Sequence, residues 1–226
     1  MTSFIRVVDE PAIVLHTRPY RETSALVSVL SARHGRVNLV GRGVRGNRRK
    51  RAIQPFSVVR IGWTGRTALA TLTGCEVDHQ YWFHGNTLAS AFYLAELVMR
   101  LVGEREPHPR LYAGLVWGLA NLDASPSTVL RSLEKLLLEE LGYGLDFRRD
   151  VDGTPLSADR SYRLQPDLGF VAAEAGFPGR ALLSIGEEDF LSADVRRVAK
   201  QLFREALAEH LGPRPLVSRQ LLVNGS

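Results

Sequence analysis

Arg33-His-Gly-Arg-Val-Asn-Leu-Val-Gly-Arg-Gly-Val-Arg-Gly-Asn-Arg-Arg-Lys-Arg51 joins a short strand pattern to a glycine-rich basic run. Val37 and Leu39 alternate with polar neighbours, which predicts a β-strand over residues 36–40. The stretch contains eight Lys or Arg residues and no Asp or Glu. The adjacent cations 48–51 repel one another, so a solvated loop is the plain interpretation. A basic loop beside a sheet is also suited to a polyphosphate backbone.

The glycines of this stretch match the dinucleotide-binding fingerprint G-x-G-x-x-G over residues 41–46. That motif requires a helix to begin at the glycines and an acidic residue about twenty positions later. Four cations and Ala52-Ile-Gln-Pro55 follow instead, and no Asp or Glu occurs near the expected position. The stretch therefore does not indicate a nucleotide cofactor.

Short strand patterns fill the first 80 residues, and Gly, Pro and Arg-rich connections separate them. The predicted strands are residues 12–15, 24–30, 36–40, 58–63 and 69–77. Five strands that carry basic and aromatic residues predict an N-terminal OB-fold over residues 1–80. An SH3-like barrel fits the strand count nearly as well.

The hydrophobic period becomes helical after residue 81. Helices are predicted over residues 86–102, 111–122, 126–141 and 194–211, with Pro126 at a first helical position and Gly142 as a stop signal. Residues 81–226 therefore predict an all-α C-terminal domain with a loop-rich insert near 143–173. The fold class is α+β.

Charge is unevenly distributed along the chain. Residues 1–80 hold 13 Lys or Arg against 5 Asp or Glu, a net +8, whereas residues 81–226 hold 16 against 19, a net −3. This asymmetry indicates a polyanion-binding domain followed by a domain with another role. The lone Cys75 fits a reducing compartment, where we expect it to be a small buried residue. No apolar run reaches ~18 residues and no signal-peptide core is present, so we expect a soluble, cytoplasmic protein.

Catalytic and metal-binding patterns are absent from the sequence. The six histidines show no metal-ligand spacing, and no G-x-S-x-G motif occurs. We expect a protein without cofactor, metal or enzymatic activity, although a nuclease built from dispersed carboxylates stays open.

Two connections pair aromatic residues with cations, as single-strand grooves do. Arg18-Pro-Tyr-Arg21 and Trp63-Thr-Gly-Arg66 lie between predicted strands. Stacking a base on an aromatic ring contributes roughly 1–3 kcal/mol, although Trp63 fits a core position equally well. The candidate nucleic-acid-binding residues are Arg18, Arg21, Arg33, Arg36, Arg42, Arg45, Arg48, Arg49, Lys50, Arg51 and Arg66.

A second basic pattern occurs in the helical part. Arg196, Lys200 and Arg204 recur every four residues on one predicted helix, and Arg131 begins a leucine-rich run on another. Cations beside apolar side chains suit an acidic peptide with a hydrophobic end. A solvated amphipathic face is the commoner explanation of such a line.

Several segments together resemble the bacterial RecO family of recombination mediators. They are Leu15-His-Thr-Arg-Pro-Tyr-Arg-Glu-Thr-Ser24, His34-Gly-Arg-Val37, Gly41-Arg-Gly43, Ile53-Gln-Pro-Phe56 and Glu140-Leu-Gly-Tyr-Gly144. The resemblance implies an OB-fold before a helical domain, and DNA repair by recombination. It also implies binding of single- and double-stranded DNA and annealing of strands coated by single-stranded-DNA-binding protein. The implied partners are that protein, RecR and, indirectly, RecA.

By the same resemblance, Arg131 and Arg196 fall where the family binds the acidic, Phe-ended tail of the coating protein, and Lys200 lies on the same line. Many relatives carry a four-cysteine zinc module after the Leu-Gly-Tyr-Gly segment. Here Asp146-Phe-Arg-Arg-Asp-Val-Asp-Gly153 follows without cysteine, so we expect this region to fold by packing alone. An RNA- or ribosome-binding adaptor with a basic loop is the alternative function.

Overall fold

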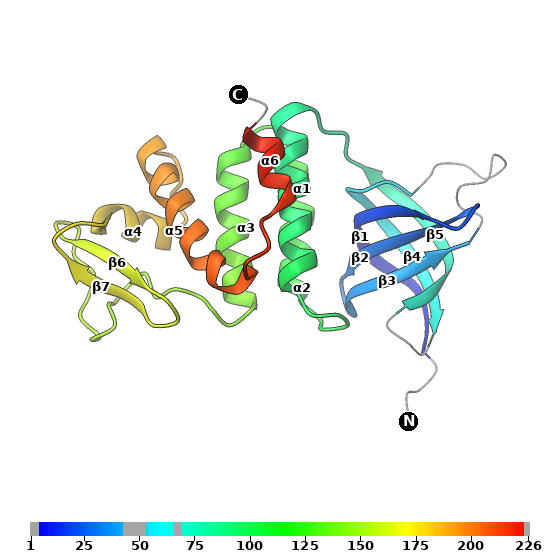
Figure 1. Ribbon diagram of the computed structural model, residues 1–226, viewed down its shortest axis with the longest axis horizontal. Coiled ribbons are helices and arrows are strands. Elements are labelled where there is room, and N and C mark those ends of the chain that lie inside the picture. Colours follow the sequence, from blue (N-terminus) through cyan, green and yellow to red (C-terminus); the bar gives the residue numbers. More distant parts are fainter. Residues whose placement is uncertain (1–4, 43–52, 66–68, 224–226) are drawn as a thin grey trace. The chain divides into compact units, whose positions relative to one another are not determined.

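The computed structural model describes residues 5–42, 53–65 and 69–223. Packing divides the chain into two compact units, the first formed by residues 1–123 and 216–226 and the second by residues 124–215. Figure 1 shows strands at the N-terminal end of the chain and mainly helices after them. The predicted α+β class is confirmed. The last barrel strand ends at residue 80, the predicted boundary, but three helices beyond that residue pack in the same unit as the barrel.

Five strands close into a barrel in the order β1-β2-β3-β5-β4. β3 and β5 are parallel, the other pairs are antiparallel, and β1 closes the barrel by pairing with both β2 and β4. This is the five-stranded barrel predicted as an OB-fold. The strands are β1 (Ile5–Tyr20), β2 (Ser24–Ser31), β3 (Gly35–Gly41), β4 (Ser57–Gly65) and β5 (Leu69–Gln80).

Buried and half-buried residues alternate along β3 and most of β4, and the buried side chains fill the barrel interior. Val37, Leu39, Val59, Ile61 and Trp63 point inward and belong to one apolar cluster. Only 2% of Trp63 is exposed, so its core interpretation is confirmed. β1 is much longer than the predicted residues 12–15, because bulges between Val7 and Glu10 and between Val14 and His16 let it bend around the barrel.

The start of β3 is fastened to the connection between the first two helices. Gly35 has a φ of +68°, and a Cβ placed on it would lie 2.0 Å from the carbonyl oxygen of Glu106. Arg36 Nε donates to the carbonyl of Val102 at 3.0 Å, and the amide of Arg105 donates to the carbonyl of Arg36 at 2.9 Å. Only glycine permits this close backbone approach at a positive φ.

Three helices complete the first unit: α1 (Gly85–Leu101), α2 (Pro109–Asn121) and α6 (Val217–Val223). The carboxylate of Glu96 on α1 accepts hydrogen bonds from the amides of Val217 and Ser218 at 2.9 and 2.8 Å, and from Ser218 Oγ at 2.5 Å. Burial of Glu96 opposes its ionisation, but these bonds and nearby Arg100 outweigh it and hold the pKa below its ordinary value. A side chain about 120 residues away in sequence thus attaches α6 to α1.

The second unit contains α3 (Pro126–Glu140), α4 (Gly179–Gly186), α5 (Ala193–Leu211) and a small sheet. Its strands β6 (Ser161–Gln165), β7 (Gly169–Ala173) and β8 (Phe177–Pro178) are arranged in the order β7-β6-β8. The predicted loop-rich insert therefore includes a hairpin, which the Gly and Pro breaks concealed. Buried Phe147, Tyr162 and Phe170 form its core, so packing of aromatic side chains organises the segment.

Cys75 differs from the expectation of a buried residue. It lies on β5 beyond the stretch that pairs with β3, where the strand is exposed.

Within the described ranges, every helix is too short or too polar to cross a membrane.

We expect Gly35→Ala to destabilise the protein by more than a positive φ alone explains. Gly85 is the matched control, because its φ is +51° but a Cβ there meets no atom within 4 Å. Gly85→Ala should cost about 1–2 kcal/mol, the penalty of the left-handed conformation. Gly35→Ala adds the clash with Glu106. Urea denaturation measures both, and equal losses in the two variants would contradict the close packing of β3.

Candidate nucleic-acid interface

The register of the first three strands places the predicted arginines at two opposite ends. Pro19 lies opposite Ala25, and Ala25 lies opposite Gly41. The β1–β2 turn and the end of β3 therefore meet at one end of the barrel. At the other end of β2 and β3, Ser31 pairs with Gly35. Six residue steps separate the two ends, which corresponds to roughly 20 Å along a strand.

Arg18, Arg21 and Arg42 share the first end, and all three are exposed. The guanidinium of Arg21 lies over the ring of Tyr20, 5.2 Å from its centroid. Among the described residues, no carboxylate forms an ion pair with Arg18 or Arg42. The structure thus brings together three predicted cations and the half-exposed aromatic ring of Tyr20.

The outer face between these ends is half-exposed, and apart from Arg18 its strand residues are neutral, although Asn38 Nδ2 donates to the carboxylate of Glu104 at 2.6 Å. Directly paired residues point to the same side of a sheet. One row consists of Arg18, Leu26 and Val40, and the next consists of His16, Ser28 and Asn38. Ser28 Oγ donates to Asn38 Oδ1 at 2.7 Å, which fixes the amide orientation. A surface of this kind, apolar and polar beside cations, suits single-stranded nucleic acid.

The second end uses its arginines to hold the fold together. Arg33 Nε donates to Glu10 Oε2 at 2.7 Å, and the Arg33 amide donates to Glu10 Oε1 at 2.7 Å. The Glu10 side chain is fully buried, and a buried carboxylate is costly without such a partner. Arg36 lies 3.5 Å from the Glu104 carboxylate and is also bound to Val102. These two residues remain candidates for phosphate contact, but each already has an acidic partner.

Six predicted cations lie outside the described residues: Arg45, Arg48, Arg49, Lys50, Arg51 and Arg66. In sequence, the first five lie within the ten residues that follow Arg42, and Arg66 lies between the end of β4 and the start of β5. OB-folds bind oligonucleotides with the β2–β3 face and with the loops between β1 and β2 and between β4 and β5. The described part of the site therefore occupies the face on which this fold usually binds ligands.

The β4–β5 side of the barrel is acidic. Arg60 Nε donates to Asp9 Oδ1 at 2.6 Å. That hydrogen bond is the main reason why the pKa of Asp9 is lowered. Glu76 and Asp78 also act on Arg60 and help to raise its pKa. Phosphates are repelled by such a surface, so Arg60 does not extend the interface.

The predicted peptide-binding residues lie in the second unit, on two helices that pack together, α3 and α5. Arg131 is buried, with Nη1 2.8 Å from the Glu134 carboxylate. Arg196 donates to the carbonyls of Phe190 and Leu191, both at 2.6 Å. Lys200 is exposed. Of the three cations, only Lys200 is displayed to solvent without a described partner.

The described residues form no candidate metal site. Across the residues that the structure describes, no group of three or more His, Cys, Asp or Glu side chains is placed to hold a metal ion. His108 lies 3.9 Å from the Glu106 carboxylate, and this contact involves only two such side chains.

Comparison with known proteins places both parts of the chain in one family. Recombination protein O N terminal matches residues 5–81, and Recombination protein O C terminal matches residues 83–220. The DNA repair protein RecO of Cellvibrio japonicus is 38% identical over 98% of this chain and 99% of the relative. The proteins of the same name from Stutzerimonas stutzeri and Halorhodospira halophila are 40% and 39% identical, over 96% and 94% of this chain and 94% and 95% of their own.

We expect Arg18→Glu/Arg21→Glu/Arg42→Glu to weaken binding to oligo(dT), because three phosphate contacts are lost. The slope of log K against log salt should fall in magnitude by about 2, from roughly 0.7 per contact. The matched control is Arg148→Glu/Arg180→Glu/Arg214→Glu, which changes the charge equally at exposed positions of the second unit. Fluorescence anisotropy from low to high salt gives both slopes. Equal losses in the two triple variants would show that net charge, and not this end of the barrel, determines binding.

Proposed function

The chain belongs to the RecO family of DNA repair and recombination proteins, and from that premise we propose that it is a recombination mediator without catalytic activity. It binds single- and double-stranded DNA and anneals complementary strands coated by single-stranded-DNA-binding protein. It also helps RecR to load RecA onto the DNA. None of these steps requires the protein to make or break a covalent bond.

The observation that carries this proposal is the meeting of Arg18, Arg21 and Arg42 at one end of the β2–β3 face. In the sequence, Arg42 leads into the cations 45–51. Such a surface contacts phosphates and stacks bases without reading base edges, because the contacts come from guanidinium groups and one ring. Sequence-tolerant binding is what a protein needs if it must act on any damaged strand.

Annealing follows from the same electrostatics. Two complementary strands repel one another through their phosphates, and base pairing starts only when they come close. Cations that neutralise both backbones release counterions and lower this barrier. The exposed bases must stay available for pairing, so phosphate contacts serve annealing better than contacts to base edges.

Coated strands require a contact with the coating protein as well. We propose that the acidic, Phe-ended tail of that protein binds near Lys200, Arg131 and Arg196. Lys200 offers an exposed ammonium group to an incoming carboxylate. Arg131 reaches the tail only if the new carboxylate competes with Glu134, which lies 2.8 Å away. Arg196 is held by two carbonyls and positions the start of α5.

The two surfaces lie in different compact units, so their defects should separate. We expect Lys200→Ala to weaken binding of a tail peptide by about 1–3 kcal/mol, because a charge-assisted contact is lost. Arg180→Ala, an exposed cation on α4 of the same unit, is the matched control. Annealing of coated strands should slow in Lys200→Ala, whereas annealing of bare strands should stay at the wild-type rate.

The barrel variant Arg18→Glu/Arg21→Glu/Arg42→Glu should show the other pattern in the same assay. It should lose annealing of bare and of coated strands and still bind the tail peptide. Stopped-flow fluorescence with labelled complementary strands gives the rates, and anisotropy gives the peptide affinity. The proposal fails if the wild-type protein does not accelerate annealing, or if it degrades the strands in the presence of Mg²⁺.

A further inference from the structure

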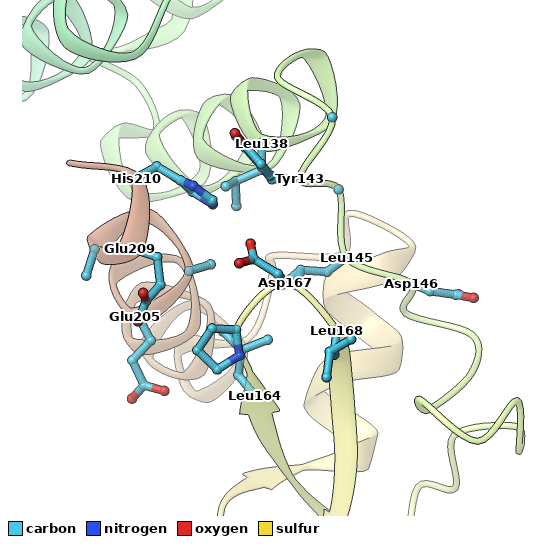
Figure 2. A pocket seen from close by; sticks show the side chains of 16 residues that line it. Leu138, Tyr143, Leu145, Asp146, Leu164, Asp167, Leu168, Glu205, Glu209 and His210 are labelled. Carbon is cyan, nitrogen blue, oxygen red and sulfur yellow. The ribbon is translucent and has the colours of Figure 1, made fainter. Parts of the chain in front are cut away.

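A cavity of about 800 Å³ opens on the second unit. One wall is the last turns of α5, with Glu205, Glu209 and His210. The opposite side is the turn between β6 and β7, with Asp167 and Leu168, and Tyr143 lies at the end that follows α3. Figure 2 shows Asp167 facing the α5 wall across this space. We refer to it as the acidic cavity.

The charge of the lining is negative. Asp167, Glu205 and Glu209 form no ion pair with any Lys or Arg among the described residues. Glu205 accepts one hydrogen bond, from Gln201 at 3.1 Å. No Lys or Arg is among the lining residues, and His210 is the one lining side chain that can become a cation. Unpaired carboxylates around a hollow attract a cationic ligand.

Apolar side chains stand exposed beside these carboxylates. Leu168 is 66% exposed at the tip of the hairpin, and Tyr143 is 45% exposed. The ring of Tyr143 stacks on His210, with centroids 3.7 Å apart and planes 16° apart. Leu138, Leu145 and Leu164 line the interior. A cavity of this size, with apolar side chains inside it and exposed apolar side chains at its rim, is typical of a binding site.

The backbone fixes the acidic groups in place. Asp167 has a φ of +57°, in the left-handed region that few non-glycine residues adopt. Glu205 and Glu209 are four residues apart on α5, which places them on one face and about 6 Å apart along the axis. Of the four lining carboxylates, Glu205 and Glu209 form a pair on a helix and Asp167 lies on a turn, whereas Asp146 accepts a hydrogen bond from the amide of Arg148 at 2.8 Å.

We propose that the acidic cavity binds a cationic, amphipathic peptide segment of a protein partner. Arg or Lys side chains of that segment pair with Glu205, Glu209 and Asp167, and an apolar side chain enters between Leu168 and Tyr143. The charge excludes the other ligands that this chain is proposed to bind, because phosphates and an acidic tail are both repelled by carboxylates. The inference goes beyond the proposed function and does not depend on it.

The spacing on α5 defines the peptide that fits. Two cations four residues apart on a helical peptide also lie about 6 Å apart, so they can match Glu205 and Glu209. An apolar residue on the adjoining face would then point toward the hollow. The probe is a fluorescein-labelled helical peptide of about 15 residues, a length that supports a helix, with Arg at four-residue spacing and Leu beside each Arg. Two comparison peptides replace Arg with Glu, or Leu with Ser.

The test compares the full-length wild-type protein with Glu205→Gln/Glu209→Gln by fluorescence anisotropy. The double variant should bind the probe at least about tenfold more weakly, because two charge-assisted contacts are lost. The matched control is Asp159→Asn/Glu174→Gln, which removes two exposed carboxylates of the same unit outside the cavity. The control should bind within about twofold of wild type. Leu168→Ser changes an exposed side chain and should weaken binding without loss of charge.

Three results would overturn the proposal. They are equal weakening in the two double variants, equal affinity for the Leu and Ser peptides, and no binding of the Arg peptide by the wild-type protein. Sedimentation gives a fourth: if the wild-type protein self-associates and Glu205→Gln/Glu209→Gln alone makes it monomeric, a second copy fills the cavity. Annealing of bare strands, measured on the same samples, should be unchanged in Glu205→Gln/Glu209→Gln. If the wild-type protein does not anneal bare strands, the proposed function is refuted, whereas this inference is unaffected.

Discussion

The close contact between Gly35 and the backbone of Glu106 is the constraint on which the rest of the first unit depends. A side chain at position 35 would collide with a carbonyl oxygen, so only glycine fits at this position at the start of β3. Arg36 then reaches Val102 and Glu104, and Arg33 holds the buried carboxylate of Glu10 nearby. Gly35 and Arg36, which lie in a stretch that looks like a basic patch, thus fasten the barrel to the connection between two helices. The opposite end of the same strands is left for a ligand.

This division explains how one strongly basic segment serves two purposes. An ion pair with a buried carboxylate stabilises the fold only while both partners remain. If Arg33 left Glu10 to bind a phosphate, the buried carboxylate would lose its partner, so Arg33 is poorly suited to bind DNA. Arg18 and Arg42 have no such partner among the described residues and stay exposed. Charge is separated on a larger scale as well. The first unit presents cations beside an open sheet face, whereas the second presents the unpaired carboxylates of the acidic cavity. The exposed end of the barrel and the acidic cavity therefore attract ligands of opposite sign.

Much of the fold could be predicted from the sequence, because alternation and helix stop signals are local. Four of the five barrel strands and the helices α1, α2, α3 and α5 were expected close to their observed bounds, whereas β1 extends well beyond the predicted residues 12–15 at both ends. The hairpin of β6 and β7 was missed, since Gly and Pro interrupt its pattern and its stability comes from Phe147 and Phe170. The pairing of Arg33 could not be anticipated either. Its partner, Glu10, lies 23 residues away on β1, and only the strand register brings the two together. Cys75 was expected to be buried, but β5 extends past the end of β3 and exposes it.

The central claim is that nucleic acid binds at the end of the barrel that holds Arg18, Arg21 and Arg42, and not at the end fastened by Gly35. Hydrogen–deuterium exchange of the full-length protein, with and without saturating oligo(dT), tests it most directly, because exchange reports protection segment by segment. The account predicts slower exchange in peptides that cover residues 18–28 and 38–42, and unchanged exchange over residues 31–36 and 102–106. Protection confined to residues 31–36 and 102–106 would contradict it.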